Sequence, residues 1–214
     1  MKISKRLKTI CDYINQNSRV IDIGCDHGYL DIYLAKEKKC TCIACDINKK
    51  ALENAKKNIK KYDLENIIET KLTDGLNNIN VKKNDIIVIS GMGTNTIKKI
   101  LTNKKLSNNI IISSNNEIIE LRKFMYDINF YIKDEKYISD NGKKYIIINF
   151  KKGIKKYKRI DFILGPILKQ NIEFLNDYNQ KINNILNNIP KKYLKERLYY
   201  KYILYNIKKG LNNL

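Results

Sequence analysis

The chain of 214 residues is long enough for one α/β domain with a sizeable core and a smaller appendage. It carries 42 Lys and Arg against 22 Asp and Glu, and the resulting net charge of +20 favours a polyanionic partner such as nucleic acid. Compositional drift of the whole sequence toward Lys, Asn and Ile could also produce much of that charge. No apolar run approaches the roughly 18 residues that a membrane helix needs, and no signal-peptide core follows the N-terminus. We therefore expect a cytoplasmic protein with no membrane partner, and a monomer.

Five cysteines lie in the first quarter of the chain, three of them in the apolar run at residues 40–45. An odd number of cysteines in a buried strand is not a disulfide framework. Alternation along a strand points Cys45 away from the face of Cys40 and Cys42, which is unsuitable for a zinc site. We expect no metal.

Strands and helices alternate through the first 150 residues. Arg19–Ile23 is a β-branched run that breaks into a glycine turn at residues 24–28 and then into an amphipathic helix at 29–36. The elements expected next are a strand at 40–45, a helix at 48–61 capped by Asn48, strands at 67–72 and 85–90, a helix from about 94, a strand at 109–113, a helix at 116–126, and strands at 130–138 and 143–150. Apolar strands in this order predict a Rossmann-like α/β fold with a mostly parallel sheet. Asp140-Asn141-Gly142 predicts a hairpin, which requires an antiparallel edge.

The pattern changes after Phe150, where a basic, glycine-broken linker begins. We place the domain boundary there, with one domain at 1–153 and a helical coiled-coil domain at 154–214. Pro190 ends the first long helix, and the second spans 192–209, so the pair is expected to form an antiparallel hairpin with Asn179 fixing its register. The expected packing positions are Leu168, Ile172, Leu175, Asn179, Ile182, Leu186 and Ile189 in the first helix, and Leu194, Leu198, Tyr202 and Tyr205 in the second.

The C-terminal part is more basic than the rest of the chain. Residues 151–214 hold fifteen Lys and Arg against four Asp and Glu, an excess of eleven. This asymmetry makes the C-terminal part the expected RNA-facing surface. A Lys-rich face on a surface helix is also common where the helix is merely solvated.

The turn from Asp22 to Gly28 carries the first chemical signal. Glycines at 24 and 28 allow a sharp turn and the close approach of a nucleotide or nucleoside to the backbone. Asp26 stands where a dinucleotide-binding loop needs a glycine, and its carboxylate would repel a pyrophosphate. The turn therefore favours a phosphate-free cofactor, and the cationic S-adenosyl-L-methionine fits the carboxylates of Asp22 and Asp26.

Acidic residues follow the next two strands. Asp46, about twenty residues after the turn, is placed to accept hydrogen bonds from both ribose hydroxyls, and Ile47 follows it as a further cofactor contact. Asp46 could instead only cap the helix that begins near residue 48. Asp74 and Gly75, after the third strand, are placed to meet the adenine amino group, but alone they would be an ordinary turn.

Several motifs together resemble the bacterial tRNA (adenine-22-N1)-methyltransferase family over almost the whole chain. They are Ser4-Lys5-Arg6-Leu7, Asp22-Ile23-Gly24-Cys25-Asp26-His27-Gly28-Tyr29-Leu30, Asp74-Gly75-Leu76, Ile89-Ser90-Gly91-Met92-Gly93 and Gly165-Pro166. The resemblance implies a Rossmann-like class I methyltransferase domain, a C-terminal coiled coil, S-adenosyl-L-methionine as donor and tRNA as acceptor.

The resemblance also suggests individual roles. Gly91 and Met92 join the expected cofactor contacts, with His27 and Gly28 in the glycine turn. The expected substrate contacts are Arg6, Tyr29, Met92 and Asn115. Members of the family tend to have Gln-Pro-Asn where this chain has Ser113-Ser114-Asn115, so a role of the Gln cannot be transferred. Members often have Glu at position 46, Ser at 25 and Ala at 28, which are conservative differences.

The expected reaction follows from the chemistry of adenine. N1 has an available lone pair, so alignment with the methyl donor should supply much of the rate. Asp26 could accept a hydrogen bond from the N6 amino group, and His27 could accept a proton, or both could only shape the loop and contact the cofactor. Ser90-Gly91-Met92-Gly93 lacks the proline and aromatic residue that amino-group methyltransferases carry there, which favours the ring nitrogen. The alternatives are a methyltransferase of a small molecule or protein, and a non-catalytic RNA-binding module.

Overall fold

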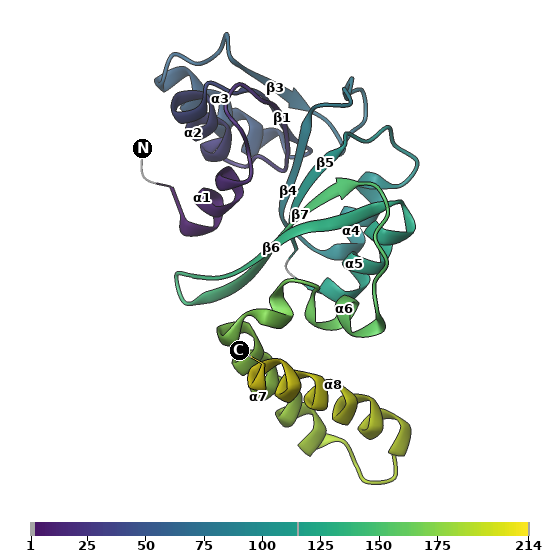
Figure 1. Ribbon diagram of the computed structural model, residues 1–214. Coiled ribbons are helices and arrows are strands. Elements are labelled where there is room, and N and C mark those ends of the chain that lie inside the picture. The colour runs from purple at the N-terminus through teal and green to yellow at the C-terminus, as the bar shows by residue number, and fades with distance from the viewer. Residues whose placement is uncertain (1–2, 115, 214) are drawn as a thin grey trace. The chain divides into compact units, whose positions relative to one another are not determined.

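The computed structural model describes residues 3–114 and 116–213. The chain divides into two compact units, Met1–Ile154 and Lys155–Leu214 (Figure 1). The first unit is an α/β domain, and the second consists of helices. Within the described residues, no helix combines the length and the apolar composition that crossing a bilayer requires.

The first unit is built on one sheet of seven strands in the order β3-β2-β1-β4-β5-β7-β6. The strands are β1 (Arg19–Ile23), β2 (Thr41–Asp46), β3 (Ile68–Leu72), β4 (Ile86–Met92), β5 (Asn109–Ser114), β6 (Phe130–Asp140) and β7 (Lys143–Lys152). The pairs among β1 to β5 are parallel, whereas β7 is antiparallel to both of its neighbours. The predicted α/β fold with a mostly parallel sheet and an antiparallel hairpin at its edge is therefore confirmed.

Helices cover both faces of this sheet. The helices are α1 (Lys5–Asp12), α2 (Tyr29–Lys38), α3 (Lys49–Lys61), α4 (Thr94–Leu101) and α5 (Ile118–Asp127). Alternate strand residues such as Val20, Cys42 and Val88 face α1, α2 and α3 in one buried cluster. Figure 1 shows α4 and α5 on the other side of the sheet. Continuous apolar strands are required because each strand residue meets a helix on one face or the other.

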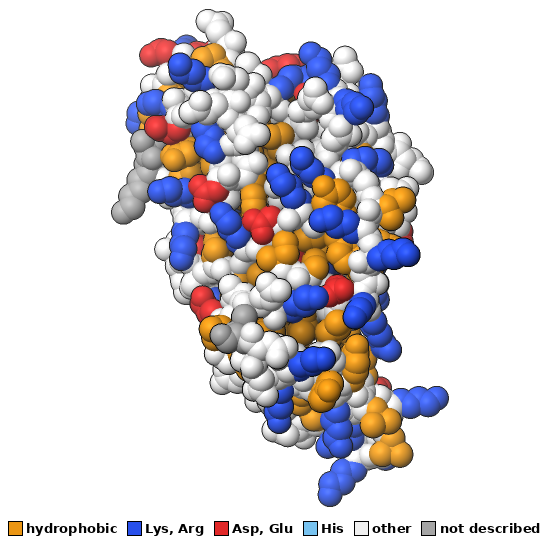
Figure 2. All heavy atoms as spheres, in the orientation of Figure 1, with side chains coloured by type: hydrophobic (Ala, Val, Ile, Leu, Met, Phe, Trp, Pro, Cys, Tyr) orange, Lys and Arg blue, Asp and Glu red, His pale blue; other side chains and the backbone are white. Residues whose placement is uncertain are grey.

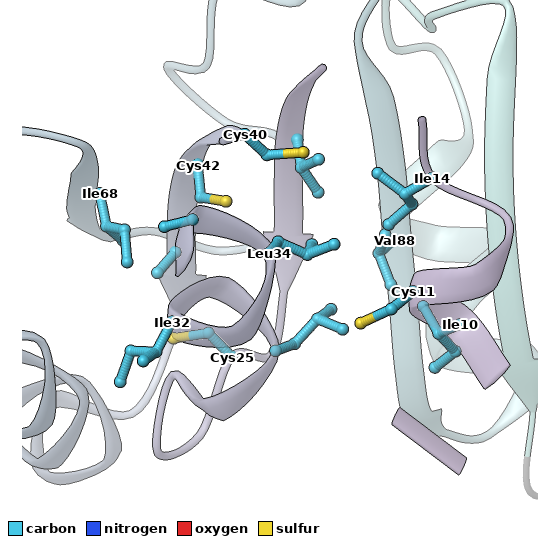
Figure 3. Close-up of a cluster of buried hydrophobic side chains, with 14 of the residues drawn as sticks. Ile10, Cys11, Ile14, Cys25, Ile32, Leu34, Cys40, Cys42, Ile68 and Val88 are labelled. Carbon is cyan, nitrogen blue, oxygen red and sulfur yellow. The ribbon is translucent and has the colours of Figure 1, made fainter. Parts of the chain in front are cut away.

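The cysteines are part of this core. Cys11, Cys25, Cys40 and Cys42 point into the hydrophobic cluster, among Ile10, Leu34 and other aliphatic side chains (Figure 3). All five cysteines are buried and free. Burial raises the pKa of Cys11 to about 12, so this thiol stays protonated and behaves as a small apolar side chain. Within the described ranges, no group of three His, Cys, Asp or Glu could hold a metal ion.

The hairpin of β6 and β7 is longer than the sequence indicated. Its strands run to Asp140 and from Lys143, and Asn141 and Gly142 have positive φ angles of 49° and 75°. Two successive left-handed residues form the turn type that matches the twist of a hairpin. β4 is also longer than expected, because it continues through Gly91 to Met92 with a register shift against β5 between Ser90 and Met92.

The second unit contains α6 (Arg159–Leu164), the 3-10 helix η1 (Leu168–Gln170), α7 (Ile172–Asn188) and α8 (Leu194–Asn212). The sequence had not indicated α6. As expected, α7 ends before Pro190, and α7 and α8 lie side by side (Figure 1). Nδ2 of Asn183 donates a hydrogen bond to Oδ1 of Asn179, so one hydrogen bond of the Asn179 side chain lies within α7 itself.

The prediction of which residues of α8 pack against the first helix is wrong. Leu194, Leu198, Tyr202 and Tyr205 are all exposed, with 64% of Leu198 and 66% of Tyr205 accessible to solvent. The buried residues of α8 are Ile203 and Ile207 instead. The helix has apolar residues around most of its circumference, so spacing alone could not select the buried face. Ile172 of the first helix is likewise exposed, because it lies at the start of α7.

Candidate active site

The turn after β1 has an unusual backbone conformation. Gly24, Asp26 and Gly28 all have positive φ, at 79°, 51° and 69°. The backbone N–H groups of Gly24 and Cys25 both donate to the carbonyl oxygen of Cys45, at 2.8 and 2.9 Å, so the turn folds over the end of β2. A Cβ at position 24 would meet Cε of Met92, the flexible end of that side chain, so the positive φ is the stronger reason for glycine here.

Asp46 connects this turn to the start of α3. Its Oδ2 accepts a hydrogen bond from the backbone N–H of Asp26 at 3.2 Å, and its Oδ1 accepts one from Asn48 at 2.8 Å. Asn48 is the residue that caps α3, by accepting from the backbone N–H groups of Lys50 and Ala51. Asn48 is therefore the cap, as expected, and Asp46 bonds to the capping residue rather than capping α3 itself. Each carboxylate oxygen has a second lone pair, so the predicted contact with ribose stays possible and remains a prediction.

A cavity of about 770 Å³ opens beside this turn. It lies at the carboxyl ends of β1, β4 and β5, where ligands bind in open α/β sheets. Its lining brings together five residues expected from the sequence, which are Arg6, Gly24, Asp26, Gly91 and Met92. A smaller cavity of about 80 Å³ shares Arg6, Gly24 and Asp26 with it and adds Asp22, His27 and Tyr29.

Five of the expected cofactor residues line neither cavity: Asp46, whose bonds are described above, and Ile47, Asp74, Gly75 and Gly28. Ile47 is exposed, and Asp74 lies in an exposed turn after β3. Gly75 and Gly28 have packing contacts that require a small residue: a Cβ would lie 3.0 Å from Ile100 at position 75 and 3.3 Å from Ala55 at position 28. Their contacts with a cofactor stay predictions. Asn115 lies outside the described residues.

Asp26 and His27 are the candidate chemical groups at the mouth of the site. Oδ1 of Asp26 lies 3.6 Å from Nε2 of His27, and their side chains are 71% and 45% exposed. The His27 ring stacks on the ring of Tyr29, with 5.6 Å between the centroids. Both groups are therefore accessible to a substrate, and the stacking holds the His27 ring beside the turn.

Asp22 lies beneath the turn and is paired with a second buried carboxyl group, Asp31 of α2. Burial raises the pKa of both groups, and each carboxyl group lies close enough to the other to affect its pKa. Two carboxyl groups can bond only if one carries a proton. Without that proton, both oxygens of Asp31 have no partner among the described residues. The burial of the pair therefore disfavours two negative charges below the turn.

Sequence reasoning missed half of the cavity lining. Lys143, Lys144 and Tyr145 of β7 reach the cavity, and so do Ser90 and Ser114 at the ends of β4 and β5. The hairpin signal predicted that β7 exists, but no local pattern indicates that its first residues lie near α1. Ser90 could have been predicted, because it lies near the end of β4, and β4 is the neighbour in the sheet of β1, which leads into the glycine turn.

The comparison with known families supports a methyltransferase. A family model described as "Methyltransferase domain" matches residues 3–148, which include the whole sheet except the end of β7. The fold and the cavity at the carboxyl ends of the strands thus define a methyltransferase domain.

Individual relatives narrow the family. The tRNA (adenine(22)-N(1))-methyltransferase of Bacillus subtilis is 30% identical over 197 residues, which cover 86% of this chain and 83% of the relative. The structure of M. capricolum TrmK in complex with S-adenosyl-homocysteine superimposes with a TM-score of 0.86 at 30% identity, covering 99% of both chains. The B. subtilis M1A22 tRNA methyltransferase TrmK gives a TM-score of 0.80 at 25% identity and covers 98% of both chains. The chain belongs to the tRNA (adenine(22)-N(1))-methyltransferase family.

Proposed function

We propose that this chain transfers a methyl group from S-adenosyl-L-methionine to N1 of an adenine in tRNA, at position 22. The observation that supports this most is that the similarity to these methyltransferases extends over both units, since M. capricolum TrmK matches 99% of the chain. An enzyme that shared only the cofactor domain would match the first unit alone. A methyltransferase of a small molecule or of a protein is therefore the weaker candidate.

The residues of the site fit S-adenosyl-L-methionine. The cofactor supplies a methyl group on a positively charged sulfonium, and it carries a ribose with two hydroxyl groups. Asp46, at the end of β2, has carboxylate lone pairs for the ribose hydroxyls. Asp22 and Asp26 provide negative charge on the two sides of the turn, and Asp22 lies beneath it with Asp31. Expected contacts of His27, Gly28, Ile47, Asp74, Gly75, Gly91 and Met92 complete the proposed cofactor set.

The protein's contribution to the reaction is chiefly positioning. N1 of adenine is nucleophilic without prior deprotonation, so holding it in line with the methyl group supplies much of the acceleration. Asp26 has an exposed carboxylate beside the cavity, and we propose that it accepts a hydrogen bond from the N6 amino group. That bond strengthens as positive charge develops on the base. His27 either accepts the proton that methylated adenine releases or orients Asp26.

The helical unit is the proposed RNA-holding element, and the domain division expected from the sequence, at 1–153 and 154–214, belongs to this proposal. Its exposed lysines, including Lys191, Lys192 and Lys195, are available to phosphates. Figure 2 shows Lys and Arg side chains projecting from this unit, with apolar side chains between them. We also propose that the enzyme acts as a monomer in the cytoplasm, where tRNA is found.

Nucleoside analysis tests the chemistry. Unmodified tRNA is incubated with the chain and S-adenosyl-L-methionine, digested to nucleosides, and analysed by chromatography and mass spectrometry. We expect N1-methyladenosine and no N6-methyladenosine. Methylation of the amino group, or none in tRNA, would overturn the proposal, whereas methylation of a protein or metabolite would support the alternative.

A further inference from the structure

The hairpin of β6 and β7 reaches the cavity from a distant part of the sequence. At its turn, Oδ2 of Asp140 accepts a hydrogen bond from the backbone N–H of Arg6 at 3.0 Å, across 134 positions. The Arg6 backbone amide holds the pKa of Asp140 below its usual value, so this acceptor stays ionised. Further along β6, Glu135 accepts from Nε of Arg122 at 2.8 Å, and both side chains are fully buried. The hairpin is thus held at two points, and the first of them involves Arg6, which lines the cavity.

Two residues of β7 face α1. Side chains alternate along a strand, so Lys143 and Tyr145 share the face of Ile147, which packs in the cluster that includes α1. The guanidinium of Arg6 lies over the Tyr145 ring, 5.1 Å from its centroid. Arg6, Lys143 and Tyr145 all line the cavity of about 770 Å³. They form what we call the hairpin wall.

The hairpin wall differs chemically from the opposite side of the site. Asp22, Asp26 and Asp46 give the turn side negative charge, which suits a cationic cofactor. Arg6 and Lys143 give the hairpin wall positive charge, which suits phosphate, and Arg6 also lines the smaller cavity beside Asp22, where the two opposite charges meet. An arginine stacked on an aromatic ring is also a surface on which nucleobases stack. Away from Arg6, which both cavities share, the turn side suits the cationic cofactor and the hairpin wall suits a nucleobase and its phosphate.

We propose that the stacked pair of Arg6 and Tyr145 is the platform for the acceptor adenine after it leaves its RNA stack, and that Lys143 holds a neighbouring phosphate. This inference rests on the proposed function and adds the place where the substrate base lies. The base must leave its stack because its N1 is otherwise blocked, and the energy lost on unstacking is partly recovered on the platform. Gly91 borders the same cavity, at the register shift of β4.

The test uses the full-length chain and distinguishes a role of the Tyr145 ring in stacking on the base from a role of the side chain in packing. Tyr145→Leu keeps an apolar side chain but removes the ring, and Tyr145→Phe keeps the ring. Lys136→Ala is the matched control, since Lys136 lies on the same hairpin and contacts Tyr13 and Asp12 rather than the cavity. The readouts are kcat and KM for tRNA, and the Kd of S-adenosyl-homocysteine by calorimetry. Melting curves establish that each variant folds.

We expect Tyr145→Leu to lower kcat/KM for tRNA about fivefold or more, as loss of one stacked base predicts, while the Kd of S-adenosyl-homocysteine changes less than about twofold. Lys136→Ala should stay close to wild type, Tyr145→Phe should lose much less activity than Tyr145→Leu because it keeps the ring, and Lys143→Ala should make tRNA binding less dependent on salt. Equal tRNA activity of Tyr145→Leu and wild type would overturn the platform, as would an equal loss of cofactor affinity. If the wild-type chain methylates no tRNA, the proposed function itself fails, which distinguishes the two failures.

Discussion

The backbone N–H of Asp26 donates to Oδ2 of Asp46 at 3.2 Å, so the residue proposed to contact the adenine amino group is bonded directly to the residue proposed to hold the ribose. The two residues come from the ends of β1 and β2, twenty positions apart. A change in Asp46 should therefore affect the turn and, through the proposed ribose contact, the cofactor as well.

Asp46→Ala should weaken the binding of S-adenosyl-homocysteine roughly tenfold or more, because hydrogen bonds to a charged acceptor contribute about 1.5–3 kcal/mol each. It should also lower kcat, since the Asp26 N–H loses its acceptor. Calorimetry and steady-state kinetics measure the two effects. Glu53→Ala, on the exposed face of α3, is the control and should bind normally. Unchanged affinity of Asp46→Ala would contradict the ribose contact.

Asp26→Asn should lower turnover much more than cofactor affinity. The amide keeps the size of the side chain and leaves the backbone bond to Asp46 intact, but it accepts a hydrogen bond from the N6 amino group more weakly. We expect kcat to fall about tenfold or more, as the loss of a charged hydrogen bond in the transition state implies. An equal loss in kcat and in cofactor affinity would make Asp26 a cofactor ligand instead.

The buried pair of Asp22 and Asp31 makes stability depend on pH. Burial raises the pKa of Asp22 to about 7 from 3.8, so the native protein holds a proton that the unfolded chain releases. The stabilisation from that proton is fully present below the unfolded pKa and is lost as pH rises through about 7. Urea unfolding at pH 5 and pH 8 should show lower stability at pH 8, and Asp31→Asn should reduce the difference. The same pH dependence in the variant would show that the pair is not its source.

Local patterns predicted the framework of the first unit well. The apolar runs of β1, β2, β4 and β5 each form a strand in a sheet whose two faces are both covered. Asn141 and Gly142 have the positive φ angles that the predicted hairpin turn needs. The glycine turn was recognisable because its residues are adjacent in sequence. The hairpin wall was not, because the bond from Arg6 to Asp140 joins segments 134 positions apart. In α8, apolar residues occur on several sides of the helix, so the sequence did not indicate that the face with Ile203 and Ile207 is the buried one.

The helical unit should contribute to RNA affinity through charge. Replacing Lys191, Lys192, Lys195 and Lys201 by Gln should leave cofactor affinity unchanged and weaken tRNA binding, because all four lysines are exposed. The slope of log K against log salt should become shallower by about 0.7–0.9 for each lysine that contacts a phosphate. Binding titrations at several salt concentrations measure it. An unchanged slope would mean that these lysines are only solvated.

The most direct test of the central claim uses two tRNA transcripts that differ only at position 22, one with adenine and one with guanine. Each is incubated with the full-length chain and labelled S-adenosyl-L-methionine, and the modified position is mapped by nuclease digestion and mass spectrometry. We predict one methyl group on N1 of adenine 22 in the first transcript and none in the second. Equal labelling of both transcripts, or label at another nucleotide, would contradict the assignment.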